Sequence, residues 1–197
     1  DKINKVYIEL TAFPMTSLEK PLFGIILRNI THRKNLEEKL NYLSTHDSLT
    51  KLYNRYFFDT EIERFQDSRL FPISIILFDI DNLKITNDTY GHSFGDKILV
   101  SFSNILLKSF RAEDIIARIG GDEFAALLPH TDEYSARKIL ERVHANIDEY
   151  NQNISNIPLH MSAGLVCVEK GESLKEMFIH ADMLMYQEKT KKSSRSS

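Results

Sequence analysis

The sequence predicts an α+β domain in which strands and helices alternate, preceded by a short β segment and a connecting helix. Beyond residue 72, short apolar runs typical of strands alternate with stretches whose apolar residues recur every three or four positions, as on one helix face. From residue 73 the predicted order is β-α-β-β-α-β-α, a ferredoxin-like sandwich with extra helices. The composition, 42% hydrophobic and 27% charged, is that of a globular protein and excludes a disordered chain.

The first thirty residues predict two strands. Apolar and polar residues alternate over residues 5–13, as in a half-buried strand, and a second apolar run covers residues 22–30. Pro14 and the polar segment Thr16–Lys20 are expected to end the first strand and separate it from the second. Because two strands alone are only marginally stable, we interpret residues 1–32 as the end of an upstream domain.

A helical linker is expected over residues 33–46. Leu36, Leu40 and Leu43 are spaced by four and three residues, which is the apolar seam of a two-stranded coiled coil. A surface helix lying on its neighbour explains so short a pattern equally well, and both interpretations stay open. Asp47-Ser-Leu-Thr is then expected to cap a second helix. That helix would contain Leu52, Tyr56, Phe57 and Ile62.

The remaining elements follow from local patterns. The nearly continuous apolar run 73–80 predicts a strand covered on both faces. Two short strands are expected on either side of Gly120-Gly121-Asp122-Glu123, which suits a tight hairpin. Those two strands are expected at 115–119 and 124–128, and a further strand at 159–168. Helices are expected at 98–106, 131–150 and 174–189.

Composition also limits the function. The formal net charge of −3 argues against a dedicated nucleic-acid binder, which carries a basic excess. The single cysteine, Cys167, cannot form an internal disulfide and fits a reducing, cytoplasmic setting. No apolar run approaches the ~18 residues of a membrane span. Because the chain opens on Asp1 rather than Met, we expect a fragment, and an upstream membrane anchor stays open.

Two acidic pairs are the candidate chemical groups. Asp79 and Asp81 close the strand 73–80, and Asp122 and Glu123 lie in the Gly-Gly hairpin. If these strands are neighbours, Asp79 and Asp122 meet at one edge, where Mg²⁺ would take carboxylates together with substrate phosphates. Such a pair would hold metal on a triphosphate and lower the barrier to attack on phosphorus. The tendency of acids to end strands and turns explains either pair alone.

The segment after Asp81 is expected to be a loop leading to a helix that starts near Lys97. Free N–H groups at the start of that helix would suit phosphate, and Asn87 with Asp96 can offer donors and acceptors to a purine edge. A turn stabilised by Asn87 and a helix capped by Asp96 explain the same residues. The other polar or small residues of this segment are Lys84, Gly91, His92 and Gly95.

Six ordered motifs carry a family resemblance. They are Phe78-Asp-Ile-Asp-Asn-Leu-Lys84, Asn87-Asp-Thr-Tyr-Gly-His-Ser-Phe-Gly-Asp96, Arg118-Ile-Gly-Gly-Asp-Glu-Phe124, Asp47-Ser-Leu-Thr-Lys-Leu-Tyr-Asn-Arg55, Ser162-Ala-Gly164 and Ala181-Asp-Met-Leu-Met-Tyr186. Together they resemble the signature of GGDEF-type diguanylate cyclases, whose fold is a nucleotidyl-cyclase palm, over roughly residues 43–190. The segment Gly24-Ile-Ile-Leu-Arg-Asn-Ile-Thr-His-Arg-Lys34 is similar, more loosely, to the exit of a PAS sensor domain.

The resemblance implies domain boundaries. They are a PAS-like fragment 1–32, a coiled-coil linker 33–46, a GGDEF domain 47–190 and a flexible tail 191–197.

The resemblance also implies a metal site and a reaction. Asp79, the carbonyl of Ile80 and Asp122 would bind Mg²⁺, with Mn²⁺ as an alternative, and Glu123 would lie at the metals or act as base. Two GTP molecules would be joined into cyclic di-GMP, each ribose 3′-hydroxyl attacking the other nucleotide's α-phosphorus and releasing pyrophosphate. Because each domain would hold one GTP, a homodimer is implied, controlled by the upstream sensor domain in cis.

Substrate and product contacts are implied at further positions. Asn87 and Asp96 would recognise guanine, and His92 would lie beside the substrate. Lys84 and Lys189 would meet phosphates. Arg111-Ala-Glu-Asp114 stands nine residues before Gly120, in the register of the family's inhibitory product site, with Arg142 as its second arginine. A surface ion pair explains the same Arg-x-x-Asp string.

Three departures from the family pattern bear on activity. Leu83 replaces the usual phenylalanine and Lys51 the usual glycine. At the C-terminus the family has Lys-x-x-Gly-Arg, whereas here Ser193 stands at the arginine position. Lys191 or Lys192 would substitute as a point charge without a bidentate fork, which puts catalytic efficiency in question.

Two other functions remain open at this point. The first is a catalytically inactive module that senses cyclic di-GMP or GTP, which the altered tail favours and the retained acids disfavour. The second is another nucleotidyl cyclase or a polymerase-like palm, because the same sheet and paired acids serve several nucleotidyl transfers.

Overall fold

The computed structural model describes residues 5–15, 22–153 and 158–194. The chain divides into two compact units, Asp1–Ser44 and Thr45–Ser197. Among the described helices, none combines the length and the apolar character needed to cross a membrane.

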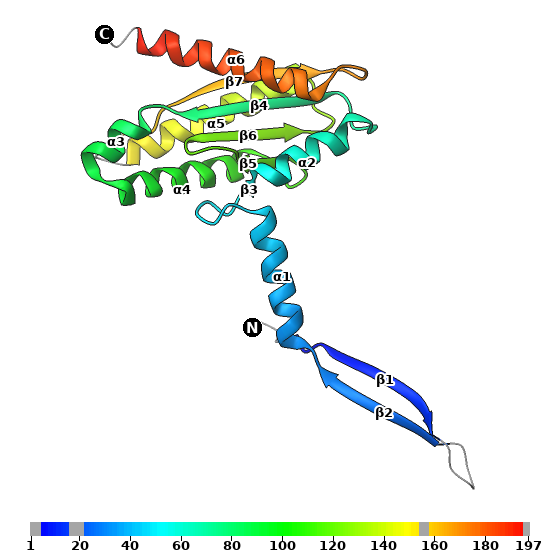
Figure 1. The fold of residues 1–197 in the computed structure, drawn as a ribbon. Helices are drawn as coiled ribbons and strands as arrows, with labels where there is room; N and C mark the ends of the chain where they lie inside the picture. The colour runs from blue at the N-terminus through cyan, green and yellow to red at the C-terminus, as the bar shows by residue number, and fades with distance from the viewer. Residues whose placement is uncertain (1–4, 16–21, 154–157, 195–197) are drawn as a thin grey trace. The chain divides into compact units, whose positions relative to one another are not determined.

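The first unit is a β-hairpin followed by a helix (Figure 1). Strand β1 (Ile8–Met15) pairs antiparallel with β2 (Leu22–Asn29), and helix α1 (Thr31–Thr45) follows. The prediction that Pro14 ends the first strand is wrong, because Pro14 lies inside β1 opposite Phe23, where an edge strand tolerates the missing N–H. The predicted polar break at Thr16–Lys20 lies outside the described residues.

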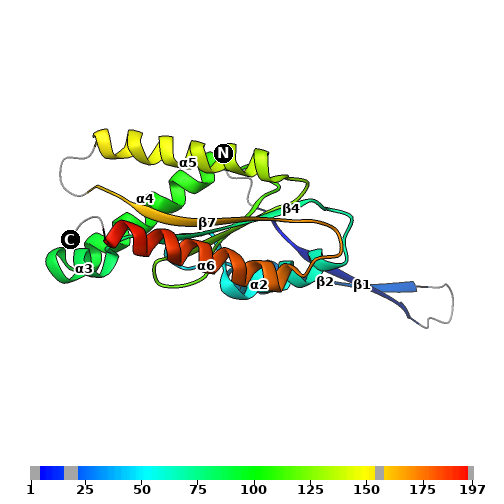
Figure 2. The ribbon, with the colours of Figure 1, turned by 90° about the horizontal axis from the view of Figure 1, so that it is seen from above.

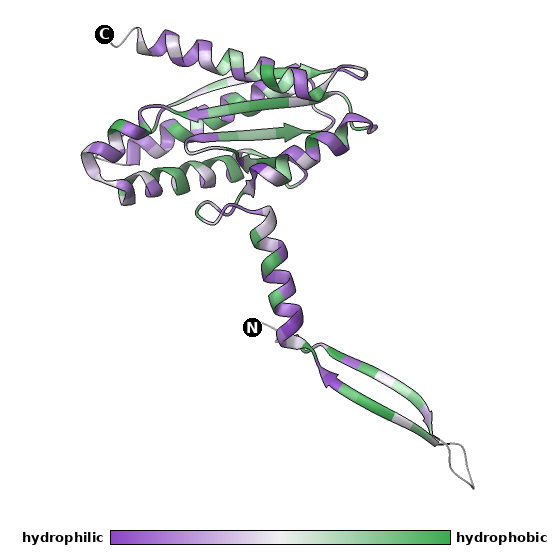
Figure 3. Cartoon of the chain, in the orientation of Figure 1, coloured by the Kyte–Doolittle hydropathy of each residue, from purple (hydrophilic) through white to green (hydrophobic). Residues whose placement is uncertain are grey.

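Apolar side chains of this unit face solvent. Large apolar residues of the hairpin region are between 39% and 69% exposed, and Figure 3 shows apolar segments along both strands. Helix α1 buries none of its residues, and Leu36, Leu40 and Leu43 are 48%, 66% and 51% exposed. The predicted leucine stripe is therefore on the surface of α1.

The second unit is built on a five-stranded mixed sheet, which confirms the α+β class. The strand order is β3-β5-β6-β4-β7; β3 is parallel to β5, and the other neighbours are antiparallel. The strands are β3 (Tyr53–Asn54), β4 (Ile73–Ile80), β5 (Ile115–Arg118), β6 (Glu123–Leu128) and β7 (Met161–Val168). The helices are α2 (Arg55–Gln66), α3 (Leu83–Tyr90), α4 (His92–Ser109), α5 (Glu133–Asn153) and α6 (Leu174–Ser193).

Helices cover both faces of the sheet, so the core has two halves. All eight residues of β4 are buried, as the continuous apolar run predicted. Ile76 and Phe78 pack with α4 and α5, whereas Ile75 and Leu77 pack with α2 and α6. Figure 2 shows α4 and α5 on one side of the strands and α6 and α2 on the other. The alternation of side chains along β4 thus supplies both cores.

The second helix begins later than predicted. Asp47 closes a turn instead, because its carboxylate accepts from the Thr50 N–H (2.8 Å). Helix α2 starts at Arg55 and is capped by Asn54, whose Oδ1 accepts from the Phe57 N–H (2.9 Å). Leu52 therefore lies before the helix. The short strand β3 between turn and helix was missed because two residues are too few to show a period.

The segment after Asp81 is helical, and the prediction of a loop there is wrong. Helix α3 buries Leu83 and Thr86, which are spaced three residues apart as on one helix face. Gly91, at φ 85°, separates α3 from α4 in a conformation that glycine adopts without strain. Asp96 is consequently within α4 and is not its cap, since the N-cap of α4 is Gly91.

The C-terminal helix is longer than predicted. Helix α6 is capped by Ser173 and continues through Ser193, whereas the sequence predicted a flexible tail from residue 191. Hydrogen bonds that link Glu188 and Lys192 to the backbone of β7 hold these last turns. Residues 195–197 lie outside the described part of the chain.

Candidate active site

The register of the sheet brings the two acidic pairs to one edge. Asp79 lies opposite Glu123 on β6 and opposite Ser162 on β7. The Ile80 N–H donates to the Asp122 carbonyl (3.0 Å), which joins the end of β4 to the Gly-Gly hairpin. Because residues opposite each other in an antiparallel pair project to the same face, Asp79 and Glu123 share one face.

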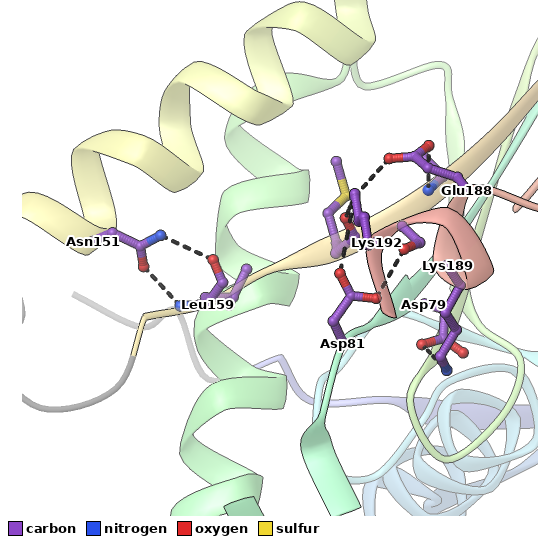
Figure 4. Close-up of polar contacts among 10 residues, drawn as sticks. Asp79, Asp81, Asn151, Leu159, Glu188, Lys189 and Lys192 are labelled. Carbon is purple, nitrogen blue, oxygen red and sulfur yellow. Dashed lines mark hydrogen bonds and ion pairs between the residues drawn. The ribbon is translucent and has the colours of Figure 1, made fainter. Parts of the chain in front are cut away.

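A lysine from the other end of the chain reaches this edge. The Lys189 Nζ of α6 donates to the Asp79 Oδ1 at 2.6 Å, and the two side chains are 39% and 8% exposed (Figure 4). The two residues are 110 positions apart in sequence. The cation expected from the sequence to meet phosphates is thus adjacent to the expected metal-binding carboxylate.

Negative charge exceeds positive charge at this edge, and the pKa shifts reflect it. Burial raises the pKa of Asp79, and the charges of Asp122 and Asp81 add to this, against the opposing hydrogen bond from Lys189. Burial, with Asp122 and Asp79, also raises the pKa of Glu123. Burial lowers the pKa of Lys189, but its contact with Asp79 outweighs this and raises it. The two acids therefore hold their protons more tightly mainly because they are buried, with their acidic neighbours adding to the effect, and Lys189 does so because of its contact with Asp79.

The donor set fits a hard divalent cation that keeps water ligands. No group of three or more histidine, cysteine or acidic side chains within the described residues forms a ready-made metal cage. Mg²⁺ does not require one, because it is usually held by one or two carboxylates plus substrate phosphates. Asp79 and Asp122 are the carboxylates that would serve here, and the backbone N–H of Ile80 donates to the Asp122 carbonyl. Burial and mutual repulsion both make the negative charges of these acids unfavourable, so a bound cation would stabilise them.

The Gly-Gly hairpin is held by an arginine whose role the sequence analysis did not identify. Arg118 donates to the Gly121 carbonyl (2.8 Å) and to the Asp47 carboxylate (3.2 Å), and its side chain is 15% exposed. Burial raises the pKa of Asp47, but hydrogen bonds from Thr50 and Arg118 outweigh it and lower that pKa. Arg118 and Asp47 each begin one of the six family motifs, and this position was the sequence signal that could have identified their role.

Of the two glycines of the hairpin, Gly120 has a steric reason to lack a side chain. A Cβ on Gly120 would collide with the Glu123 carboxylate, coming within 3.1 Å of its Cδ. A Cβ on Gly121 would meet nothing within 4 Å. Gly120 therefore makes room for the Glu123 side chain, whereas no described atom would obstruct a side chain at position 121.

The residues expected to recognise guanine lie on the α3–α4 pair. Asn87 is on α3, and its Oδ1 is buried with no hydrogen-bond partner in the described part of the chain. Asp96, on α4, is exposed and borders a cavity of about 500 Å³ lined mainly by apolar residues such as Leu49 and Phe94. The exposed Asp96 carboxylate can accept hydrogen bonds from a polar ligand edge, and the amide nitrogen of Asn87 can donate to one.

The other expected substrate contacts are surface residues of the same two helices. Lys84 is exposed near the start of α3. His92 is the first residue of α4 and is also exposed. Neither the Lys84 nor the His92 side chain contacts Asp79, Asp122 or Glu123 in a hydrogen bond or ion pair within the described residues.

The residues of the expected inhibitory site lie close together. The Asp114 carboxylate is buried and accepts from the Arg111 N–H (2.7 Å). Arg142 on α5 donates to the carbonyl of Ser109 (2.8 Å), two positions before Arg111. Burial raises the pKa of Asp114, against the opposing Arg111 hydrogen bond and the charges of Arg111 and Arg142. The exposed Arg111 and Arg142 flank this turn with positive charge.

Comparison with known proteins agrees with these motifs. Residues 44–195 match the family model described as "Diguanylate cyclase, GGDEF domain". "Diguanylate cyclase DgcM" of Escherichia coli K12 is 33% identical over 187 residues, which are 93% of this chain and 45% of DgcM. "Biofilm architecture maintenance protein MbaA" of Vibrio cholerae is 36% identical over 167 residues, covering 77% of this chain and 21% of MbaA. The chain thus spans less than half the length of these relatives.

Solved structures share the fold. The coiled coil and GGDEF domain of DgcB from Caulobacter crescentus, in complex with c-di-GMP, aligns with a TM-score of 0.72 and 25% identity, covering 80% of this chain and 86% of that one. A microbial GGDEF domain described for its interaction with cyclic di-GMP aligns with a TM-score of 0.67 and 31% identity, covering 77% of this chain and 94% of that one.

Proposed function

Because this chain belongs to the diguanylate cyclase GGDEF domain family, we propose that it condenses two GTP molecules into cyclic di-GMP with release of two pyrophosphates. The observation that supports this most is the convergence of Asp79, Asp122 and Glu123 at one sheet edge with Lys189 bound to Asp79. Such an edge suits phosphoryl chemistry, in which catalysis consists mainly of positioning and charge stabilisation.

Each group at this edge has a distinct role in the proposal. Asp79, Asp122 and the Ile80 carbonyl would hold Mg²⁺ or Mn²⁺, which when bound neutralises phosphate charge and lowers the pKa of a coordinated hydroxyl. Glu123, whose pKa is raised by burial and by Asp122 and Asp79, is suited to take up the proton of the attacking 3′-hydroxyl. Lys189 would exchange its contact with Asp79 for a phosphate oxygen.

Substrate recognition is assigned to the α3–α4 pair. Asn87 and Asp96 would bind the guanine edge, because the Asp96 carboxylate is exposed and can accept from guanine and the Asn87 amide can donate to it. His92 would lie beside the nucleotide, and Lys84 would meet its phosphates.

The direct test is turnover of the purified chain with GTP and Mg²⁺, identifying the product by mass. Asp122→Ala is expected to abolish cyclic di-GMP formation while circular dichroism shows a preserved fold. Glu141→Ala removes an acid from the exposed surface of α5 and serves as the matched control with wild-type turnover. Product formation by Asp122→Ala at the wild-type rate would refute the assignment. Turnover of ATP in place of GTP would refute the base assignment.

An inactive sensor module is the second candidate, because Ser193 stands where the family pattern has its phosphate-binding arginine. Calorimetry with GTP and cyclic di-GMP, run beside the turnover assay, separates the two functions. Binding of cyclic di-GMP without turnover of concentrated protein would establish the module.

A homodimer is part of the proposed mechanism, because each domain would bring one GTP. The exposed Leu36, Leu40 and Leu43 of α1 support a two-stranded coiled coil over residues 33–46. Leu40→Glu is expected to shift the protein toward monomer in analytical ultracentrifugation and to lower activity per chain. Lys39→Glu, a charge change at an exposed α1 residue outside the leucine stripe, is the control. Equal dimerisation of both variants would exclude this seam.

Product inhibition is proposed at Arg111, Asp114 and Arg142. Two exposed arginines beside a buried carboxylate suit the phosphates and guanine of cyclic di-GMP. Arg111→Ala is expected to retain initial rates and to lose inhibition by added product. Arg137→Ala removes an exposed arginine of α5 that pairs with Glu133, and its inhibition should match wild type.

We also propose that residues 1–32 are the end of a PAS-like sensor domain acting in cis on a GGDEF domain that begins at residue 47 and continues through α6. The support is the amount of apolar hairpin surface that faces solvent, since two strands need further strands or a covering element to be stable. Ile25→Lys together with Leu27→Lys is expected to reduce self-association of this chain in light scattering. Unchanged self-association would show that the apolar surface of the β1–β2 hairpin does not need a covering element.

A further inference from the structure

A cleft borders the acidic edge on the side of helix α6. Its volume is about 710 Å³, and its lining includes Asp81, His160, Met161, Glu188, Lys189 and Lys192. The end of β4, the start of β7 and the last turns of α6 therefore share one cavity with the lysine that reaches Asp79.

Two residues of α6 fasten its last turns to β7. The Glu188 carboxylate accepts from the Ala163 N–H (3.2 Å), and the Lys192 Nζ donates to the Met161 carbonyl (2.5 Å). The same Lys192 pairs with Glu188 at 2.6 Å (Figure 4). We call these two residues the Glu188–Lys192 clamp. It contacts the β7 backbone at two points, so it fixes both the distance and the rotation of the helix end.

Lys189 lies within the turn that the clamp spans. Residues 188, 189 and 192 project to neighbouring positions on one side of a helix. Lys189 extends from there to Asp79 (2.6 Å), and Lys192 lies 3.9 Å from Asp81. Asp81 is itself held by the Ser162 hydroxyl (2.8 Å). Each lysine thus faces one of the two aspartates that end β4.

Helix ends fray unless contacts hold them, because their last carbonyls lack partners within the helix. The sequence after Lys189 is polar and predicts such fraying. Loss of the clamp would allow the last turns of α6 to unwind, and the Lys189 ammonium would no longer have a fixed position.

We propose that the Glu188–Lys192 clamp positions the Lys189 ammonium at Asp79, and that Lys192 is therefore a positioning residue for the nucleotide phosphates. This inference rests on the proposed function for its kinetic consequence, and on the geometry alone for the position of Lys189. The clamp stabilises the helix end in a chain that has Ser193 where the family pattern has arginine.

The first test needs no nucleotide. Lys192→Met removes the charge and keeps the aliphatic stem, and Lys175→Met is the matched control because Lys175 is an exposed lysine of the same helix that pairs with Glu63. In ¹H–¹⁵N spectra of lysine ammonium groups, the Lys189 signal, assigned by its loss in Lys189→Met, is expected to disappear in Lys192→Met and to persist in Lys175→Met. A persistent Lys189 signal in folded Lys192→Met would overturn the proposal.

The second test is kinetic. Lys192→Met is expected to raise the KM for GTP about tenfold, the effect of losing one charge-assisted hydrogen bond, with a smaller change in kcat. In a Lys189→Met background it should cause no further rise, because the clamp acts through Lys189. Full additivity of the two substitutions, or an equal effect of the control Lys175→Met, would overturn the proposal.

The two arms separate this inference from the proposed function. If the wild-type chain makes no cyclic di-GMP, the proposed function fails and the spectra still decide the positioning. If Lys192→Met does not fold, Glu188→Gln replaces it, because glutamine retains an acceptor for the Ala163 N–H while weakening the pair with Lys192. Glu188→Gln is then expected to weaken the Lys189 signal, and an unchanged signal would overturn the proposal.

Discussion

Replacing Gly95 with alanine tests the proposed placement of Asn87 in the guanine-binding part of the site. Gly95 is a buried residue of α4 that lies against the Asn87 side chain of α3. A Cβ on Gly95 would overlap the Asn87 amide oxygen and lie 2.9 Å from its Cγ and 3.2 Å from its Nδ2. The amide must therefore move, whereas the backbone of α4 need not.

Two effects of opposite sign follow, and their sizes separate them. Alanine favours a helix interior over glycine by about 1 kcal/mol, so the fold should not be lost. The displaced amide moves by about 1 Å, which is enough to break one hydrogen bond to guanine worth about 1 kcal/mol. We therefore expect the KM for GTP to rise about fivefold while the melting temperature stays within a few degrees of wild type.

The assay compares GTP with inosine triphosphate, which lacks the exocyclic amine of guanine. Gly95→Ala should lower the preference for GTP, and the effect should vanish in an Asn87→Ala background. Ser93→Ala, a helix-favouring change at an exposed residue of the same helix, should leave the KM unchanged. Wild-type KM and preference in folded Gly95→Ala would refute the placement of Asn87 in the guanine site.

Three further predictions concern stability. The pKa of Glu123 is raised by burial and acidic neighbours, so its stabilising effect is present below its ordinary value of 4.5 and is lost as pH rises through the raised folded value. Glu123→Gln should flatten this loss of stability in melting scans with EDTA. It should also raise the melting temperature at neutral pH by about 2 °C or more. The pKa of Asp47 is lowered, so its contribution to the stability of the fold is present above pH 3.8 and is lost as pH falls through the lower folded pKa. Asp47→Asn should remove this acid transition and cost about 1–3 kcal/mol in urea unfolding. An unchanged acid transition would contradict the Arg118 contact. Asn54→Ala removes the cap on the Phe57 N–H (2.9 Å) and should cost about 1 kcal/mol, whereas an unchanged urea midpoint would show that water replaces the cap.

The sequence alone was sufficient where the structure depends on neighbours along the chain. The buried strand Ile73–Ile80 followed from its apolar run, and helix α5 followed from apolar residues at helical spacing. The acidic motifs named the residues of the candidate site, because the chemical type of a side chain needs no coordinates. The helix α3 escaped prediction because its polar residues hide a pattern of only two buried positions, Leu83 and Thr86.

The tertiary structure decided which of these residues meet. The pairing register places Asp79 opposite Glu123, and a shift of one residue would send the two side chains to opposite faces. The end of α6 is fixed by contacts with β7 that bring Lys189 to a carboxylate 110 positions away. Local periodicity carries no information on such pairings, because they are set by which strands share hydrogen bonds and by which surfaces pack together.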